Sequence, residues 1–423
     1  MKKSIYKKVS ILLTVLMATS ALFVGCGTSS TDDGEEKVTL NYLMFDDFEY
    51  NYVTETVDLN KEYQKTHPNV TIEFEKSKDS TEFQKTLKIR NSADELPDIM
   101  AIKPFMLASY VDVLADLTDT EAAKNNTYAD QYAVEGKIVG VPTSCFYEFV
   151  YYRKSIFEKY DLEIPQTWDE FIDVANTIKE KGEVVPILLG AKDAWTDYPY
   201  NEYMPLLESG NGAYWNEMAT IDEPFSEGMP FNTAYKKIQK LYDEDVFGED
   251  PLGVGNDQVT AKFNAGEGAM IASGQWFAAK LDSTDDVGVF FLPARDTEDS
   301  TLYATVMADL FLSTPKDGEN KDASIEFINW YLSSDYYETY LGEKGIDSPM
   351  EGVEVSNDFI NQAFDTMDPT FIVVDGGNSE FTRIQNAINF NVKELGQEML
   401  LGQDFDEMMD KLNEQWKEAK NTK

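Results

Sequence analysis

Histidine is almost absent from this sequence, which contains His67 alone. A single histidine excludes most histidine-rich metal sites and argues against a Ser-His-Asp triad, which needs its histidine beside a serine and a carboxylate. Glycine motifs that cradle phosphates or dinucleotides are also missing. The sequence therefore predicts no catalytic residue, no cofactor and no metal site, and we expect a protein that is not an enzyme.

Basic residues are scarce relative to acidic ones. The 423 residues include 36 Lys and Arg against 77 Asp and Glu, so the formal net charge is −41. A chain this acidic repels nucleic acid and anionic lipid headgroups, which predicts no nucleic-acid partner. The acidity favours solubility at a crowded surface. It leaves a cationic solute or peptide as the alternative ligand, because net charge says little about the potential inside one cleft.

Long apolar runs are missing after residue 24. Before it, four lysines within the first eight residues precede the apolar run Val9–Val24. A basic start followed by a short apolar stretch is typical of a secretory signal and is too short for a comfortable membrane span. We therefore expect residues 1–25 to be a signal peptide.

Cysteine is rare as well, with Cys26 and Cys145 alone in the chain. The sequence Leu-Phe-Val-Gly-Cys that ends at Cys26 resembles a lipobox, with Phe23 at a position more often occupied by leucine. The resemblance implies that Cys26 carries diacylglycerol and anchors the protein to the extracellular face of the cell membrane. Residues 26–36 are expected to be a disordered tether. An unlipidated secreted protein is the alternative, and Cys145 is expected to be a small buried residue outside any disulfide.

The first part of the chain predicts α/β structure. Val38–Phe45 has the composition of a strand, Asn51–Thr66 that of a helix, and Val70–Glu75 alternates apolar and polar residues. Strand, helix and strand within about 40 residues indicate a βαβ unit and a parallel sheet. A helix near Glu82–Ala93 and a short strand at Leu96–Ala101 are expected to follow.

The second part repeats this pattern. The capping box Thr167–Glu170 predicts the start of a helix, and Val184–Gly190 predicts a buried strand. Apolar residues at helical spacing predict further helices around 323–332, 381–399 and 405–416.

Six blocks, in the same order, resemble the carbohydrate class of extracellular solute-binding proteins, the maltose-binding-protein-like class. They are YQKTHPNV at 63–70, ELPDI at 95–99, GKIVGVP at 136–142, YRKSIF at 152–157, PQTWDEF at 165–171, and FNAGEGAM followed by GQW within 263–276. The fourth block has Arg where the family has Asn. Each block is a weak signal, but chance matches rarely preserve order.

The resemblance implies a periplasmic-binding-protein-like fold of two lobes. Each lobe is expected to hold a mainly parallel sheet flanked by helices, with a hinge of strands that cross near Thr143–Phe146, near Tyr303–Met307 and after about Gly352. The expected lobes are residues 37–143 plus 306–352 and residues 144–305 plus 353–421. A carbohydrate, expected to be an oligosaccharide, would bind between the lobes of a monomer, and hinge closure would present it to the permease subunits of an ABC transporter.

Trp276 is the first candidate for ligand binding. A sugar ring has apolar faces and a rim of hydroxyls, so aromatic platforms and carboxylates together recognise it. Trp276 follows the strand-like segment 270–273 and matches a stacking tryptophan of the family. Packing between the lobes is the alternative role.

The remaining candidates lie after predicted strands, at crossings or at a helix start. They are Phe45, Asp46, Asp47, Phe146, Tyr147, Trp195, Asp309, Glu380 and Phe381. Asp46 or Asp47 could instead cap a helix, and plain packing or a solvated loop is the alternative for the others. A cell-surface glycoside hydrolase needs only two carboxylates, so the sequence leaves it open as a less favoured function. A structural adhesin would not need the hinge blocks.

Overall fold

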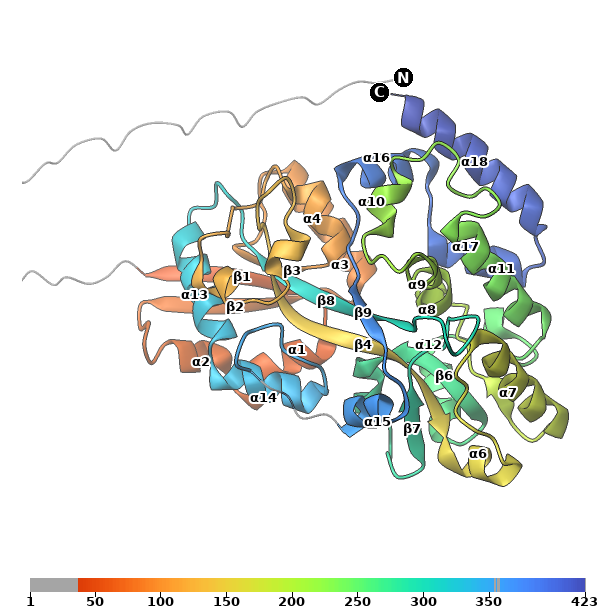
Figure 1. Ribbon diagram of the computed structural model, residues 1–423. Coiled ribbons are helices and arrows are strands. Elements are labelled where there is room, and N and C mark those ends of the chain that lie inside the picture. Colours follow the sequence, from red (N-terminus) through yellow and green to blue (C-terminus); the bar gives the residue numbers. More distant parts are fainter. Residues whose placement is uncertain (1–36, 354, 356–357, 423) are drawn as a thin grey trace, which may run out of the picture. The chain divides into compact units, whose positions relative to one another are not determined.

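The computed structural model describes residues 37–353, 355 and 358–422 (Figure 1). The predicted signal peptide, the tether and Cys26 lie outside the described residues. No helix in the described ranges is both long enough and apolar enough to cross a membrane.

Nine strands of the described chain form one mixed sheet in the order β2-β1-β3-β8-β4-β6-β5, with β7 paired to β4 and β9 paired to β8. The strands are β1 (Val38–Met44), β2 (Val70–Lys76), β3 (Ile99–Ile102), β4 (Val141–Arg153), β5 (Val185–Ile187), β6 (Gly268–Gly274), β7 (Val287–Phe290), β8 (Tyr303–Ser313) and β9 (Thr370–Val373). The parallel pairs β1–β2, β1–β3 and β5–β6 match the βαβ prediction.

Helices flank this sheet. They are α1 (Asp47–Asn51), α2 (Leu59–Tyr63), α3 (Ser80–Ser92), α4 (Pro104–Tyr110), α5 (Glu121–Lys124), α6 (Lys154–Tyr160), α7 (Trp168–Lys181), α8 (Tyr198–Asn201), α9 (Met204–Ser209), α10 (Tyr214–Met218), α11 (Pro230–Asp243), α12 (Asn256–Asn264), α13 (Lys321–Leu332), α14 (Asp335–Lys344), α15 (Asp358–Thr366), α16 (Ser379–Ile388), α17 (Val392–Leu400) and α18 (Phe405–Asn421). Five short helices are η1 (Tyr52–Thr56), η2 (Ala129–Tyr132), η3 (Ala194–Asp197), η4 (Pro251–Gly253) and η5 (Gln275–Lys280).

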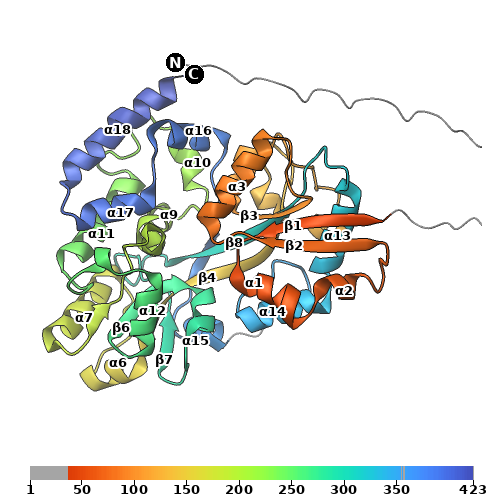
Figure 2. The same cartoon turned by 180° about the vertical axis from the view of Figure 1, so that it is seen from behind.

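The two long strands β4 and β8 contain the first two predicted crossings. They pair antiparallel from Val141 opposite Leu312 to Tyr147 opposite Val306. Figures 1 and 2 show them running between β1–β3 on one side and β6 with its helices on the other. Because crossing strands run in opposite directions between the lobes, β8 pairs antiparallel with β3 and β4 pairs antiparallel with β6 and β7. The sheet as a whole is therefore mixed: β1–β2, β1–β3 and β5–β6 pair in parallel, and every antiparallel pair involves β4 or β8.

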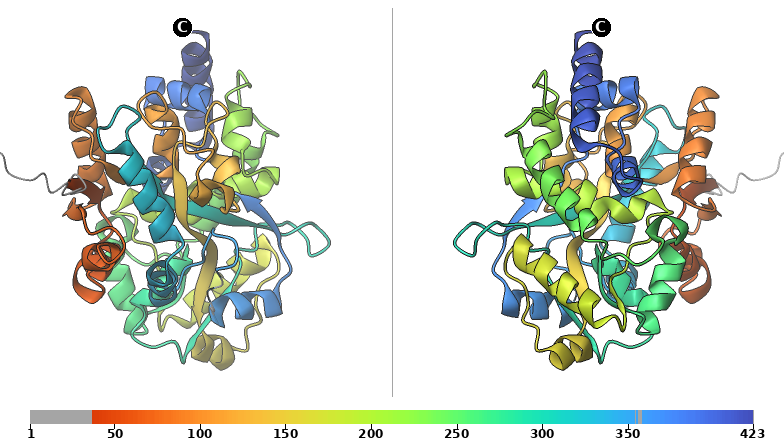
Figure 3. Two further views of the ribbon diagram at one scale, coloured as in Figure 1. Left: turned by 90° about the vertical axis from the view of Figure 1, so that its left-hand side faces the viewer. Right: turned by 90° about the vertical axis from the view of Figure 1, so that its right-hand side faces the viewer.

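The buried hydrophobic residues separate on either side of these strands. Residues drawn from 40–146 and 308–350 form two clusters, which we call the first lobe, and residues drawn from 149–304 and 363–419 form a third, which we call the second lobe. After Gly352 the chain enters the second lobe through α15 and then adds β9 beside β8. In both views of Figure 3 the C-terminal helix α18 lies at the top of the second lobe.

Two predicted helices are interrupted. The segment predicted as one helix over 51–66 divides into α1, η1 and α2, because Asp58 adopts φ 53° and its carboxylate caps α2. The segment predicted over 381–399 divides at Asn389, which has φ 52°. Asp and Asn tolerate left-handed backbone better than most residues, so each can end one helix and let the chain turn into the next. The Thr167 cap is confirmed, with Glu170 N donating to Thr167 Oγ1 at 3.3 Å.

Candidate ligand-binding site

Trp276 lies between the two lobes. It follows the end of β6 on η5, is partly buried, and packs against core residues of both lobes. The Nζ of the exposed Lys280 lies 5.0 Å from the centre of the indole. Because Trp276 packs against the cores of both lobes, its contacts would change if the lobes moved relative to each other.

Gly274 lets the indole fold back onto the end of β6. A Cβ at this position would lie 2.3 Å from Trp276 Nε1 and 3.2 Å from Phe146 Cδ2. The buried Tyr151 hydroxyl lies 3.1 Å from the carbonyl oxygens of both Gly274 and Gln275, which fixes the turn. The glycine of the Gly-Gln-Trp block is thus needed for close packing of the tryptophan.

Trp195 extends the aromatic surface. It lies on η3 with 41% of its surface exposed, and its ring centroid is 5.9 Å from that of Trp276 at an interplanar angle of 52°. Tyr198 stacks on Trp195 at 6.5 Å, and its hydroxyl donates to Glu148 Oε2 at 2.7 Å. Burial raises the pKa of Glu148 well above its usual range, which favours the neutral form of the carboxyl that holds the Tyr198 hydroxyl.

The first lobe contributes an ion pair. Lys103, which directly follows β3, places Nζ 2.6 Å from Asp309 Oδ2 on β8 and 5.3 Å from the centre of the Phe45 ring. The Phe45 ring packs 5.0 Å from the ring of Phe83. Asp309 Oδ1 is buried and has no hydrogen-bond partner in the described part of the chain. Phe45 thus supports the lysine, and one carboxylate oxygen of Asp309 is left without a partner among the described residues.

Asp46 and Asp47 have different surroundings. Asp46 caps α1, accepting from Glu49 N at 2.8 Å, and accepts from Lys344 Nζ at 2.8 Å. Burial alone would raise the pKa of Asp46, but Lys344 and the capping bond lower it below its usual value. Asp47 is exposed and pairs with Lys76. The capping role considered for this pair therefore belongs to Asp46, whose oxygens are already used.

The register of β4 and β8 connects the ion pair to the tryptophans. Ser144 lies opposite Asp309, and Phe146 lies opposite Met307, so these four side chains share one face of the crossing strands. Phe146 is also close to Gly274, where Trp276 begins its turn. We call this chain of neighbouring side chains the interlobe band. Its members are Lys103, Asp309, Phe146, Met307, Trp276 and Trp195.

Three other sequence candidates lie elsewhere. Tyr147 points to the opposite face of β4 from Phe146 and packs 5.0 Å from Phe371 on β9. Phe381 is buried in the second lobe, stacked 5.6 Å from Trp215, which favours packing over ligand contact. Glu380 is exposed and pairs with Arg383 at 2.7 Å.

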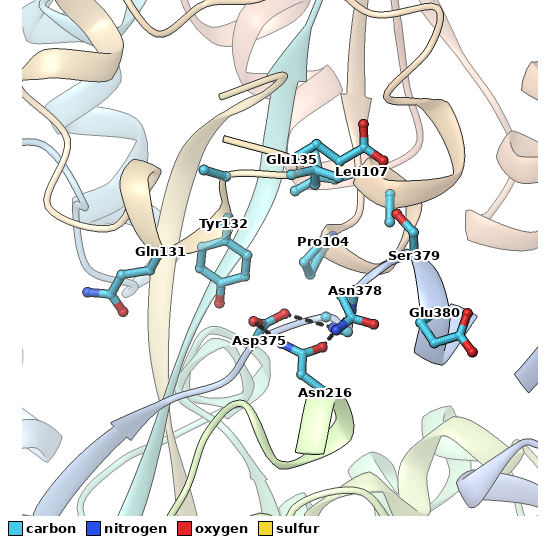
Figure 4. Close-up of a pocket in the computed structure, with 15 residues that line it drawn as sticks. Pro104, Leu107, Gln131, Tyr132, Glu135, Asn216, Asp375, Asn378, Ser379 and Glu380 are labelled. Carbon is cyan, nitrogen blue, oxygen red and sulfur yellow. Dashed lines mark hydrogen bonds between the residues drawn. The ribbon is translucent and has the colours of Figure 1, made fainter. Parts of the chain in front are cut away.

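A cavity of about 300 Å³ also opens between the lobes (Figure 4). Its first-lobe wall comes from α4 and residues 131–135, and its second-lobe wall from Asn216 and residues 375–380, so Glu380 is the only sequence candidate that lines it. The wall groups bond one another: Asn216 Nδ2 donates to Asp375 Oδ2 at 2.8 Å, and Asn378 N donates to Asn216 Oδ1 at 2.6 Å. These bonds belong to the turns that begin α16.

The cavity and the interlobe band lie on opposite faces of β8. Tyr132 lines the cavity and accepts a hydrogen bond from Ala308 N at 3.2 Å, and both side chains belong to the same hydrophobic cluster. Asp309, the next residue, points the other way because strand side chains alternate. We assign the candidate site to the band, since the band, and not the cavity, combines exposed aromatic surface with an unpartnered carboxylate oxygen.

Sequence reasoning missed Lys103 and the buried Glu148. Lys103 follows β3 as Phe45 follows β1, so the rule that ligands bind outside the carboxyl ends of strands would have found it. Glu148 lies within an apolar strand. The sequence alone does not show whether its side chain is exposed to solvent or, as in the structure, buried and bonded to Tyr198. No group of three or more His, Cys, Asp or Glu side chains in the described ranges is arranged to hold a metal ion.

Comparison with known proteins identifies the family. Residues 49–338 match the model of the bacterial extracellular solute-binding protein family. The chain belongs to this family. The multiple sugar-binding protein of Streptococcus mutans is 24% identical over 370 residues, which cover 82% of this chain and 84% of that protein.

Solved structures show the same fold for this solute-binding protein. The apo form of RafE from Streptococcus pneumoniae aligns with a TM-score of 0.73 at 21% identity, covering 93% of this chain and 100% of that chain. A chitin oligosaccharide binding protein aligns with a TM-score of 0.76 at 19% identity, covering 91% and 100%. The predicted two-lobed α/β fold is thereby confirmed.

Proposed function

We propose that this solute-binding protein captures a neutral oligosaccharide on the interlobe band and delivers it to the permease subunits of an ABC importer. The observation that carries the proposal is the composition of the band. Trp276 and Trp195 supply aromatic surface from the second lobe, and Asp309 with Lys103 supplies hydrogen-bonding groups from the first. Apolar ring faces and a rim of hydroxyls need these two kinds of partner.

The relatives support a carbohydrate ligand. One is named a multiple sugar-binding protein, another a chitin oligosaccharide binding protein, and RafE has been solved with raffinose. Because the identities to these three proteins are 19–24%, the particular sugar does not carry over, and raffinose and chitin oligosaccharides serve as starting probes.

The crossing strands give the mechanism of capture. The lobes would move about β4, β8 and the segment that leads to β9, with boundaries near 143/144, 305/306 and 352/353. A ligand that contacts Trp276 and Asp309 at once binds the closed arrangement more tightly than the open one, so it shifts the population toward closure. The permease would recognise the closed monomer.

The lipid anchor at Cys26 belongs to the same proposal. Attachment at the extracellular side of the cell membrane would hold the protein near its permease through the 26–36 tether. Replacing Cys26 with Ser should release the protein into the medium or leave an unprocessed precursor. Intact-mass measurement and membrane partitioning test this, and an unchanged mass with unchanged partitioning would contradict it.

Ligand binding without turnover is the central test. Thermal-shift screening followed by calorimetry would use raffinose, mannotriose and triacetylchitotriose, with putrescine and a basic peptide as cationic comparisons. We expect saturable binding of at least one neutral sugar and no new reducing ends after prolonged incubation. New reducing ends would instead identify a glycoside hydrolase, and binding confined to the cations would replace the sugar by a cationic solute.

A further inference from the structure

The Lys103–Asp309 pair has features that a simple cross-strand ion pair does not need. Its side chains retain 23% and 14% of their surface, so solvent or a ligand can reach part of each, although not Asp309 Oδ1 itself. Nζ bonds one carboxylate oxygen, while the other, Oδ1, is buried without a partner. A lysine ammonium has three donors and a carboxylate has about four acceptor sites, so both groups keep unused capacity.

The surroundings of the pair are balanced in charge. Asp46 and Lys344 form a second ion pair beside it, with Nζ 2.8 Å from Oδ2. Lys76, at the end of β2, pairs with Asp47, and Glu49 is 1% exposed and accepts from the Tyr42 hydroxyl at 3.0 Å. Each of these three lysines is thus matched by one aspartate, and the carboxyl without a lysine partner, Glu49, is buried away from a ligand.

We propose that Lys103 is a ligand-binding and specificity-determining residue. Asp309 accepts from one hydroxyl of a sugar ring, Lys103 donates to the adjacent hydroxyl, and their mutual neutralisation selects uncharged sugars. This inference rests on the proposed function and adds to it the charge class of the ligand and the residue pair that enforces it. Phe45 acts here as a positioning residue, because its ring lies under the ammonium.

The pair would explain selectivity, because neutralising either residue leaves the charge of the other without a partner. If Lys103 is neutralised, Asp309 becomes an unpaired, partly buried carboxylate and favours a cationic ligand. If Asp309 is neutralised, Lys103 becomes an unpaired cation and favours an anionic one. A purely structural ion pair would lose stability when broken, but it would not exchange one ligand charge for another.

The experiment is a charge-selectivity cycle measured by calorimetry. The variants are Lys103→Met, Asp309→Asn and the double variant. The neutral probes are raffinose, mannotriose and triacetylchitotriose; the charged probes are chitotriose, with three amino groups, and trigalacturonate. Breaking the exposed Lys76–Asp47 pair with Lys76→Met provides the matched control. Circular dichroism checks folding, and Lys103→Gln replaces Lys103→Met if the latter does not fold.

We expect each single variant to lose roughly tenfold affinity for the neutral sugar that the wild type binds, since a hydrogen bond to a charged group is lost. Lys103→Met should gain relative affinity for chitotriose and Asp309→Asn for trigalacturonate. The double variant should lose little more than the worse single variant, because both residues hold one diol. Lys76→Met should stay within about twofold of the wild type, since exposed pairs contribute little.

Two outcomes would overturn the inference alone. In one, both single variants bind the neutral sugar as the wild type does. In the other, they weaken neutral and charged probes equally, as a structural defect would. A wild-type protein that binds none of the neutral probes would instead refute the proposed function, and the inference would fall with it.

Discussion

The two ends of the interlobe band are built from different chemistry and belong to different lobes. The second-lobe end is aromatic: its members are Trp276 and Trp195, and the one cation described against them is Lys280, whose Nζ lies 5.0 Å from the centre of the Trp276 indole. The first-lobe end is an ion pair beside a strand end, with Asp309 14% exposed. Aromatic contact area supplies affinity that tolerates many sugars, whereas paired charges fix which hydroxyls and which ligand charge are accepted. On the proposed function, a ligand would therefore have to contact both lobes to gain both the aromatic contact area and the selection by charge.

The ends also differ in how they are held. Trp276 is fixed by close packing against Gly274 and by hydrogen bonds from Tyr151 to the turn below it. Lys103 is held by contacts at its tip, to Asp309 and over Phe45. A rigid platform opposite an adjustable polar pair suits a site that closes, because the platform sets the position of the ring and the pair adapts to its hydroxyls.

Truncating the aromatic end should have the largest effect. Trp276→Ala removes a central aromatic contact, which is typically worth about 2–4 kcal/mol, or roughly 30- to 1000-fold in affinity. Calorimetry with the cognate sugar measures this, on protein shown to be folded by circular dichroism. Trp330→Phe, in α13 of the first lobe, is the matched control and should bind normally. Wild-type affinity in Trp276→Ala would mean that the residue only packs between the lobes.

Each lobe also holds a buried carboxyl whose proton should make stability pH-dependent. Burial, with Asp46 nearby, raises the pKa of Glu49 to about 7, and burial raises the pKa of Asp197 to about 7. The folded state thus keeps protons that the unfolded chain releases above its ordinary pKa of 4.5 or 3.8. Their stabilising contribution is full below about pH 4 and is lost as pH rises through 7.

Glu49→Gln and Asp197→Asn should remove this loss. Between pH 5 and pH 8 each variant should gain about 2–3 kcal/mol in unfolding free energy relative to the wild type. Urea unfolding at the two pH values measures the difference, and the effects should add because the residues lie in different lobes. Asp47→Asn, at an exposed position, is the control. A Glu49→Gln variant with the pH profile of the wild type would show that Glu49 is ionised when folded.

A methyl group beneath the platform should have a smaller effect. Gly274→Ala places Cβ 2.3 Å from Trp276 Nε1, so the indole must shift from its position. Overpacking of this kind costs about 1–3 kcal/mol, part of which should appear as roughly tenfold weaker sugar binding. Gly342→Ala in α14 is the control, because a Cβ there meets nothing within 4 Å. Equal affinity in the two variants would show that the platform tolerates displacement.

Much of the fold could be predicted because local patterns and ordered motifs agree with it. The alternation in Val70–Lys76 and the Thr167 cap both report local energetics directly, and both were found as expected. The helix breaks at Asp58 and Asn389 were missed, because a left-handed residue inside an amphipathic pattern changes direction without changing periodicity. The antiparallel pairing of β4 and β8 depends on contacts between distant segments, which periodicity does not encode.

The candidate site was predictable only in part. Trp276 and Asp309 lie on the band, and the first had a motif to mark it. Phe381 lies at a helix start, as the sequence predicted for a ligand residue, but its ring packs into the core against Trp215. The position of Lys103 after β3 could have marked it as a candidate, but its pairing with Asp309 across 206 positions has no sequence signature. Residue type and position relative to a strand end predict that a side chain is near the site; the direction in which it points is a tertiary property.

The smallest expected effect is that of salt on the affinity for the sugar. It distinguishes binding through the aromatic end from binding through unpaired charge at the first-lobe end. The protein carries a net charge of −41, so a charged ligand would bind with affinity that changes steeply with ionic strength. A neutral sugar, however, carries no charge for salt to screen, and on the interlobe band Lys103 is already paired with Asp309. We expect affinity to change by less than about twofold between roughly 0.02 and 0.15 M salt. The Asp309→Asn variant, which leaves Lys103 unpaired, should keep this insensitivity for a neutral sugar but show weakening with salt for trigalacturonate. A steep loss of wild-type affinity for the neutral sugar would mean that unpaired charge contributes to binding, and the first-lobe end would then have to be sought away from the Lys103–Asp309 pair.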